Sequence, residues 1–481
     1  MKASTLLSLC TIIITVGTKK VSSVSQYQKL LVVSYDAFRY DYFNRNLTLF
    51  MNDLRKENTH ADYMKNVFVT KTFPNHFSIA TGLYEETHGV IGNQVLIPET
   101  GEILKDSYAM YHYNEEIAPI WIVNEKASPD RHSGVIMWPG CKYEYLGVKP
   151  TFLQKFNMSI PFEDRVDLLI SWFTHPTQPI NLGFLYIEEP DTTGHMVGIN
   201  AKAFNLVLQK LDNVTKYIYE NLNKHGLKDV NVIHLSDHGM ESITPKRIID
   251  LNKFVNSSDY KIVESSAALQ IFPIVGKLDT VYKQLVDAAN KTGHFTVYKK
   301  EEIPDRYHFR KNPRVPPIFI VAEIGYAFSD VYKSIEYYEK MQNLTVNNLT
   351  EFGIHGYDNE EPAMRPMFFA YGPMFKKNYE IQPFNNIDLF PLFCEILNLS
   401  CPPVNGTLEN VRSCLNSSLE IPTFQIGLAI VGVMILLGIG IFMAVYIVRR
   451  RRDRLNSYHR IFSAESDSEY LQNGQSDFGL I

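Results

Sequence analysis

Three apolar runs of strand length, each followed within a few residues by an aspartate, constrain the fold of this chain most strongly. The runs cover residues 29–34, 182–187 and 230–235, and the aspartates that follow them are Asp36, Asp191 and Asp237. Other apolar runs of this length cover residues 134–138, 318–322 and 367–371. The clearest amphipathic helix between such runs has Phe204, Val207, Leu211, Val214, Ile218 and Leu222 on one face, and Gly226 follows its end.

Strands that alternate with helices are typical of an α/β fold, in which helices cover both faces of a mostly parallel sheet. The chain has 481 residues, of which 45% are hydrophobic, so it can bury a core large enough for such a sheet. Ligands of these folds bind at the carboxyl ends of the strands. We therefore expect the three aspartates to lie together along one edge of the sheet.

Histidines accompany these aspartates. His195 follows Asp191 by four residues, His238 follows Asp237 directly, and His355 lies in a glycine-bounded loop. Carboxylate and imidazole ligands together suit zinc, and a pair of metal ions can hold both the attacking and the leaving oxygen of a phosphoryl transfer. A single histidine is more often structural, but this joint arrangement at predicted strand ends is hard to obtain by chance. The pattern therefore predicts a two-metal site.

A threonine hydroxyl stands out in the segment from Val67 to Tyr84. Residues 67–69 predict a short strand, and Pro74 can open a helix because its missing N–H would be unpaired there. Thr72 is then expected at the helix N-terminus, where free N–H groups and the helix dipole favour an anion such as phosphate. A threonine beside a proline is most often an ordinary helix cap, so this segment alone does not establish a catalytic role.

The two ends of the chain carry apolar segments that indicate secretion and membrane anchoring. Lys2 followed by a short apolar run is typical of a secretory signal peptide, which we place at residues 1–23. Near the other end, the uncharged stretch 426–448 is long enough to cross a bilayer, and Arg449 to Arg452 follow it at once. A buried core helix is the alternative, but the arginines at its boundary argue against it.

Positive residues next to a membrane span stay in the cytoplasm, which sets the topology of a type I protein. Residues 24–415 are then an extracellular domain, 416–425 a juxtamembrane linker and 449–481 a polar cytoplasmic tail that we expect to be disordered. Asn-X-Ser/Thr acceptors for N-linked glycans agree, because all of them precede the span. Their asparagines are at positions 46, 157, 213, 256, 290, 343, 348, 398, 405 and 416.

Four cysteines remain once a signal peptide is removed, an even number in an oxidising compartment. Cys394, Cys401 and Cys414 cluster before the predicted span and are expected to staple the end of the extracellular domain. Cys141 either pairs with one of them or stays free. The net charge of −5 gives no indication of a nucleic-acid partner.

Together, these motifs resemble the ectonucleotide pyrophosphatase/phosphodiesterase family, within the alkaline phosphatase superfamily. The resemblance covers roughly residues 27–410. It rests on Asp36, Lys71-Thr72-Phe73-Pro74-Asn75, His88-Gly89-Val90-Ile91-Gly92-Asn93, Glu188-Glu189-Pro190-Asp191-X-X-Gly194-His195, Ser236-Asp237-His238-Gly239-Met240 and His355-Gly356-Tyr357-Asp358-Asn359. We expect a short type I membrane member, with no cysteine-rich module before the catalytic domain and no nuclease-like domain after it.

The resemblance implies an alkaline-phosphatase-like α/β fold and a site with two Zn²⁺ ions. It assigns Asp191, His195 and His355 to one zinc ion, and Asp36, Asp237, His238 and Thr72 to the other. It also makes Thr72 the nucleophile that forms a covalent phosphothreonine intermediate. Asn93 matches the side chain that hydrogen-bonds the phosphoryl oxygen in the transition state.

The resemblance further implies a substrate class. Phe73 matches a family position that packs on a nucleobase, and Phe156 falls near the position of a tyrosine on the other face of the base. Stacking on aromatic rings contributes about 1–3 kcal/mol per base and tolerates different bases. We therefore expect hydrolysis of extracellular dinucleoside polyphosphates, NAD, ADP or ATP to nucleoside 5′-monophosphates at the plasma membrane.

Two alternatives stay open at this point. A lipid-directed member of the same family would cleave lysophospholipids or choline phosphodiesters with the same nucleophile and metals. A catalytically silent adhesion or receptor ectodomain would have no reason to keep these residues in order. One departure from the family pattern is Ala37, where glycine is usual; if this position needs positive φ, alanine strains the loop beside Asp36.

Overall fold

The computed structural model describes residues 24–264, 266–342, 345–416 and 423–472. The predicted signal peptide therefore lies outside the described residues. The chain divides into two units, Met1–Asn416 and Ser417–Ile481.

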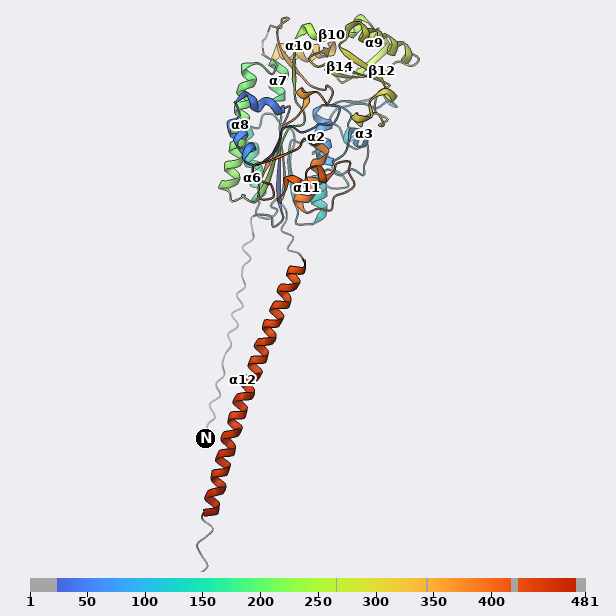
Figure 1. The fold of residues 1–481 in the computed structure, drawn as a ribbon. Coiled ribbons are helices and arrows are strands. Elements are labelled where there is room, and N and C mark those ends of the chain that lie inside the picture. The colour runs from blue at the N-terminus through green and yellow to red at the C-terminus, as the bar shows by residue number, and fades with distance from the viewer. Residues whose placement is uncertain (1–23, 265, 343–344, 417–422, 473–481) are drawn as a thin grey trace, which may run out of the picture. The chain divides into compact units, whose positions relative to one another are not determined.

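An eight-stranded sheet forms the centre of the first unit (Figure 1). Its strands lie in the order β18-β2-β17-β8-β1-β7-β5-β6. They are β1 (Lys29–Tyr35), β2 (Thr59–Ala61), β5 (Ser133–Ile136), β6 (Phe152–Gln154), β7 (Leu182–Ile187), β8 (Val230–Leu235), β17 (Phe368–Tyr371) and β18 (Tyr379–Ile381). Strands β8, β1, β7, β5 and β6 are parallel, whereas β17 is antiparallel to both β8 and β2. The prediction of a mostly parallel sheet is confirmed.

Helices cover both faces of this sheet (Figure 1). On one face lie α6 (Phe162–Phe173) and α8 (Lys202–Lys224), and on the other lie α2 (Thr72–Thr81) and α11 (Leu389–Leu397). Helix α8 is the predicted amphipathic helix, and Phe204 and Leu211 on its apolar face are fully buried. The remaining helices of the unit are α1 (Leu49–Glu57), α3 (Glu85–His88), α4 (Tyr108–Tyr111), α5 (Ile120–Ala127), α7 (Asp191–Val197), α9 (Leu278–Thr292) and α10 (Tyr332–Gln342).

A second, antiparallel sheet has its own hydrophobic core. It consists of β11 (Tyr260–Val263), β12 (Ala268–Pro273), β14 (Ile318–Ala322) and β13 (Phe295–Lys299) in that order. The strand predicted at residues 318–322 is therefore present but belongs to this sheet. Short strand pairs complete the fold: β3 (Val95–Leu96) with β4 (Ile103–Leu104), β9 (Glu241–Ile243) with β16 (Phe352–Ile354), and β10 (Ile248–Ile249) with β15 (Ala327–Phe328).

The short strand predicted at residues 67–69 is wrong, because this segment is irregular. The side chain of Asn75 satisfies its backbone instead of a neighbouring strand. Asn75 Oδ1 accepts the N–H of Val67 at 3.0 Å, and Asn75 Nδ2 donates to the carbonyl of Val69 at 3.0 Å.

The second unit contains helix α12 (Thr423–Gln472). Within it, Val431–Ser457 is long and apolar enough to cross a membrane, with a mean hydropathy of 2.7. This range overlaps the predicted span 426–448. The expectation of a disordered tail is wrong as far as Gln472, because the helix continues through the arginines, which are good helix formers.

Candidate active site

The three aspartates lie together at the carboxyl edge of the central sheet. Asp36 follows β1 and Asp237 follows β8, whereas Asp191 begins α7 just after β7. Because β1 is paired in parallel with both β7 and β8, the carboxyl ends of these strands are adjacent. The expected edge arrangement is therefore present, and all three side chains are buried or nearly so.

The predicted histidines face these carboxylates through Nε2. His238 Nε2 lies 3.1 Å from Asp237 Oδ2 and 3.5 Å from Asp36 Oδ1. His195 Nε2 and His355 Nε2 lie 3.4 Å and 3.6 Å from Asp191 Oδ1. Two groups are close enough to hold one metal ion each: Asp36 with Asp237 and His238, and Asp191 with His238 and His355. The first matches the expected set, whereas in the second His238 takes the place expected for His195.

Each of these histidines is fixed by a hydrogen bond at its other ring nitrogen. Nδ1 of His195 bonds to the carbonyl of Gly353 at 2.7 Å, that of His238 to the carbonyl of Gly239 at 3.0 Å, and that of His355 to the carbonyl of Thr70 at 2.9 Å. A carbonyl only accepts, so Nδ1 carries the proton and Nε2 is left with a free lone pair. This is the tautomer and the outer hydrogen bond that metal-binding histidines have.

The carboxylates have oxygens that nothing in the described chain satisfies. Asp36 Oδ1, Asp191 Oδ1 and Asp237 Oδ2 are buried without a hydrogen-bond partner among the described residues. Buried polar atoms are almost always paired, so this group of orphaned oxygens needs an explanation. Burial, together with the neighbouring carboxylates, raises the pKa of Asp36 and Asp237, and burial raises the pKa of Asp191. Bound cations would satisfy the oxygens and favour the ionised carboxylates, so these residues fit metal ions.

Thr72 lies beside this cluster. It begins α2, as the sequence predicts, and Pro74 falls in the first turn, where a missing N–H breaks no helical bond. Thr72 Oγ1 is 3.3 Å from His238 Nε2. His76, one turn further along α2, bonds to the carbonyl of Thr72 at 2.8 Å and to Ser34 Oγ at 2.8 Å, so the first turn is anchored to β1.

Asn93 lies near the Asp191 group, because it lines the same cavity as His195 and His355. Its Oδ1 accepts the backbone N–H of Phe73 at 2.9 Å, and because that partner can only donate, the orientation of the amide is fixed. The Nδ2 group is thereby directed away from Phe73. That cavity has a volume of about 180 Å³, is here called the polar cavity, and has Lys71, Gln94, His195, Glu264, Ser266, Tyr338 and His355 among its lining.

The two predicted aromatic walls line a separate cavity of about 140 Å³, here called the aromatic cavity. Phe73 and Phe156 are joined there by Trp138 and Tyr186. Phe156 is 56% exposed, so its ring is accessible at the mouth. Both phenylalanines that the resemblance assigned to the nucleobase are therefore brought to one cavity next to Thr72.

Tyr186 is a site residue that the sequence reasoning missed. Its hydroxyl donates to Asp36 Oδ2 at 2.5 Å, and its ring, 6.2 Å from that of Phe156, lines the aromatic cavity. Tyr186 therefore connects the aromatic cavity to the carboxylate cluster. Its position near the end of an apolar strand that precedes Asp191 was the available signal, but apolar strands often contain tyrosine. His76 was detectable from its helical spacing to Thr72.

Ala37 adopts a positive φ, the conformation that would strain an alanine at this position. Its φ is 57°, in the left-handed region, where a Cβ costs about 1–2 kcal/mol. Its N–H donates to Asp237 Oδ1 at 3.1 Å. This hydrogen bond connects the turn that carries Asp36 to the carboxylate of Asp237.

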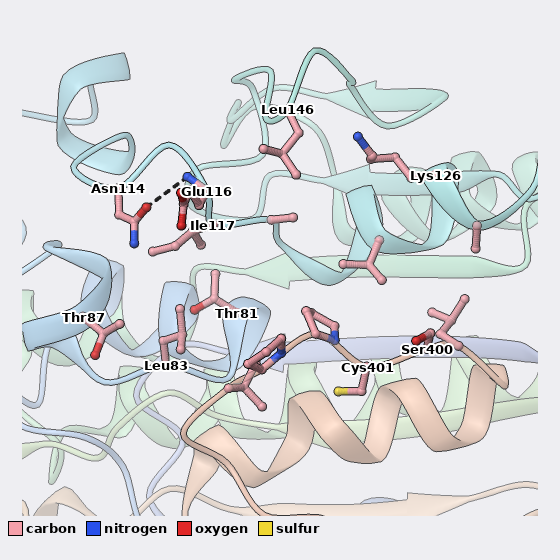
Figure 2. Close-up of a pocket in the computed structure, with 17 residues that line it drawn as sticks. Thr81, Leu83, Thr87, Asn114, Glu116, Ile117, Lys126, Leu146, Ser400 and Cys401 are labelled. Atoms are coloured by element: carbon pink, nitrogen blue, oxygen red, sulfur yellow. Dashed lines mark hydrogen bonds between the residues drawn. The ribbon is translucent and has the colours of Figure 1, made fainter.

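Of the three cysteines that precede the predicted span, the structure brings two together. Cys394 and Cys401 are in hydrogen-bonding contact, while Cys141 is buried beside the aromatic cavity. Cys401 also lines a larger cavity of about 740 Å³, which contains none of the predicted site residues (Figure 2). Leu146 and Lys126 lie on one side of it, across from Thr81 and Cys401.

Fold and site together describe an α/β protein with a candidate metal centre beside a threonine hydroxyl. The type I phosphodiesterase/nucleotide pyrophosphatase family matches residues 30–358. Human ectonucleotide pyrophosphatase/phosphodiesterase family member 5 is 38% identical over 400 residues, which are 82% of this chain and 79% of that protein. Human bis(5′-adenosyl)-triphosphatase is 36% identical over 403 residues, which are 83% of this chain and 84% of that protein.

Solved structures agree with these relatives. Murine ectonucleotide pyrophosphatase/phosphodiesterase 5 is 38% identical, with a TM-score of 0.72, and the match covers 81% of this chain and 100% of that one. An inactive T72A variant of the murine protein, solved in complex with AMP, gives the same values. The chain belongs to the type I phosphodiesterase/nucleotide pyrophosphatase family and is an enzyme of that class.

Proposed function

We propose that this protein is a cell-surface two-zinc phosphodiesterase/pyrophosphatase that cleaves extracellular nucleotides to nucleoside 5′-monophosphates through a phosphothreonine. One observation carries the proposal. The hydroxyl of Thr72 lies 3.3 Å from His238 Nε2, at the junction of two Asp/His groups whose buried oxygens lack partners. A metal ion held by these groups can activate a hydroxyl so placed for attack on phosphorus.

The ligand sets proposed are Asp191, His195 and His355 for one zinc ion, and Asp36, Asp237, His238 and Thr72 for the other. Bound zinc would supply Lewis acidity, lowering the pKa of the Thr72 hydroxyl and offsetting charge on the phosphoryl oxygens. The chain's own groups orient the reaction. The bond from His76 to the carbonyl of Thr72 holds the nucleophile in place, and Asn93, with Oδ1 engaged by Phe73, directs Nδ2 to donate to a phosphoryl oxygen.

The aromatic cavity supports a nucleotide as the substrate. The rings of Phe73 and Phe156 offer flat apolar walls to a base whose phosphate reaches Thr72. A murine relative has been solved with AMP, and another relative is named for hydrolysis of a dinucleoside triphosphate. Dinucleoside polyphosphates, NAD, ADP and ATP are the candidate substrates.

We also propose a type I membrane topology. Residues 1–23 form a cleaved signal peptide, 24–415 the glycosylated extracellular domain, 416–425 a linker, 426–448 the transmembrane segment and 449–481 the cytoplasmic tail. The apolar range Val431–Ser457 of α12 supports the anchor. Glycosidase treatment should lower the apparent mass of the mature protein, and protease added to intact cells should leave only the span and the tail.

The test of activity is a chromatographic screen of the purified extracellular domain. The substrates are the nucleotides above, lysophosphatidylcholine and glycerophosphocholine, each assayed with zinc, with a chelator, and with zinc restored. We expect nucleoside 5′-monophosphate as a product, lost on chelation and recovered with zinc. Release of choline or of a monoglyceride, with every nucleotide untouched, would replace the nucleotide assignment with the lipid alternative.

A further inference from the structure

The polar cavity lies where a leaving group has to depart. In phosphoryl transfer the attacking and leaving oxygens are roughly in line, and paired metal groups hold one each. Thr72, the attacking group, contacts His238, whereas the polar cavity is lined by His195 and His355 beside Asp191. The aromatic cavity is lined by other residues. The two cavities therefore separate the base from the leaving group.

A buried ion pair lies in this polar cavity, directly beside the nucleophile. Lys71 Nζ is 2.7 Å from Glu264 Oε2, and the two side chains are 5% and 4% exposed. Among the residues that line this cavity, Lys71 is the lysine and Glu264 is the carboxylate. A cation next to Thr72 would by itself favour a polyphosphate leaving group, and Glu264 offsets that cation.

The chain holds Glu264 in this place from several directions. Glu264 Oε1 accepts the backbone N–H of Gln94, the neighbour of Asn93. A Cβ on Gly92 would lie 2.7 Å from Glu264 Oε1, so a larger residue there would displace this carboxylate. Glu264 itself has a φ of 72°, a strained value for a residue with a side chain. The strain is offset by these contacts, so the carboxylate is a built part of the site.

A second acidic residue, Asp330, holds the loop that follows Glu264. Asp330 Oδ2 accepts the N–H of Ser266 at 3.2 Å, and its Oδ1 is buried without a hydrogen-bond partner among the described residues. Ser266 Oγ in turn donates to the carbonyl of His355 at 3.0 Å. Ser266 therefore connects the loop that carries Glu264 to His355.

We infer that Glu264 is a specificity-determining residue, which neutralises Lys71 and so disfavours leaving groups that carry extra phosphate. The inference rests on the proposed function. In the reaction, Thr72 Oγ1 loses its proton to solvent and bonds to the α-phosphorus, while the bond to the bridging oxygen breaks and the electron pair leaves with that oxygen. A leaving group with one phosphate, such as the mononucleotide half of NAD, is therefore preferred over the pyrophosphate of ATP.

The test compares charge variants by two readouts. The first is inhibition by inorganic pyrophosphate of the hydrolysis of bis(p-nitrophenyl) phosphate, and the second is the ratio of kcat/KM for ATP to that for NAD, both at fixed excess zinc. Glu264→Gln keeps an oxygen for Gln94 but removes the carboxylate charge beside Lys71. The inhibition constant should fall about fivefold and the ratio should rise by the same factor, an effect of one charge at short range in a partly solvated site. Both changes should shrink at high salt.

Lys71→Gln should raise the inhibition constant for pyrophosphate and lower the ratio of kcat/KM for ATP to that for NAD, because it leaves the carboxylate of Glu264 without this cation. The double variant should return close to wild type, which a merely structural role for the pair would not produce. Asp229→Asn is the matched control. It breaks another Lys–carboxylate pair, in which Asp229 is 58% exposed and lies 2.6 Å from Lys29, at the other edge of the sheet, and it should leave both readouts unchanged.

Values within twofold of wild type for folded Glu264→Gln in both readouts would overturn the inference. If that variant does not fold, an unchanged inhibition constant for Lys71→Gln would overturn it instead. The chromogenic ester separates this inference from the proposed function. A wild-type protein that cleaves the ester but no nucleotide refutes the nucleotide assignment, while pyrophosphate inhibition still tests the role of Glu264.

Discussion

The two edges of the central sheet both carry polar groups, but these groups are paired to different extents. At the amino edge, Lys29 is paired with Asp229 at 2.6 Å, and Asn124 and Asn181 exchange hydrogen bonds of 3.0 and 2.9 Å. At the carboxyl edge, each of the three aspartates has a buried oxygen without a partner among the described residues. The chain has therefore satisfied its own polar groups at one edge and left them for a ligand at the other.

The difference separates structural from functional polar groups. A paired buried group contributes to the folded state, and breaking the pair costs stability. A cluster of unpaired carboxylates destabilises the protein unless something else binds, which is a cost typical of functional sites. Equivalent substitutions at the two edges should thus change different properties, stability at the amino edge and activity at the carboxyl edge.

The largest effect is expected for Thr72→Ala. Removing the nucleophile should lower kcat by at least about 10³-fold, while the midpoint of thermal unfolding stays close to wild type. Thr81→Ala, at the other end of the same helix, loses a buried hydrogen bond of 2.6 Å to the carbonyl of Phe77 and should cost about 1 kcal/mol of stability with kcat unchanged. Substantial turnover by the Thr72 variant would refute the mechanism.

Asparagine substitutions just before and just after β8 compare the two edges of the sheet most directly. Asp237→Asn should lower kcat/KM by about 10²-fold or more, because it removes a proposed metal ligand. In the metal-free protein it should raise the unfolding temperature, because it removes one of three mutually repelling buried carboxylates. Asp229→Asn should lower stability and leave activity unchanged. Calorimetry with and without chelator, combined with kinetics, measures both; equal effects at the two edges would contradict the comparison.

A smaller effect is expected for Tyr186→Phe. The variant keeps the ring in the aromatic cavity and loses only the hydrogen bond to Asp36. We expect a decrease in kcat/KM of about tenfold, the lower end of the range for the loss of an outer hydrogen bond to a metal ligand. KM for a nucleotide and for a chromogenic ester should change alike, since no contact to the base is removed. A loss confined to the nucleotide would instead assign Tyr186 to base binding.

The smallest effect is expected for Ala37→Gly. Glycine relieves the strain at a φ of 57° but makes the unfolded chain more flexible, so the net gain should be about 1 kcal/mol or less. The free energy of unfolding by denaturant measures it. A loss of stability would show that alanine fits this turn without strain.

The sequence predicts the carboxyl edge well because parallel strands end at a common edge, whatever the distance between them in the chain. It also predicts that Thr72 lies at the start of a helix, because Pro74 is favoured in the first turn of a helix. It does not predict that residues 67–69 are irregular, because their backbone is satisfied by the side chain of Asn75. Nor does it predict the contact of Lys71 with Glu264, 193 residues away, since Glu264 reaches the site from the second sheet. Apolar patterns indicate strands but do not say which sheet they join.

The metal content of the purified extracellular domain tests the central claim most directly. Elemental analysis by mass spectrometry should find two zinc ions per wild-type chain and per Asp229→Asn chain, and fewer for Asp237→Asn. Activity should follow the zinc content as metal is removed and restored. A wild-type protein that hydrolyses phosphodiesters fully with no bound metal would contradict the account.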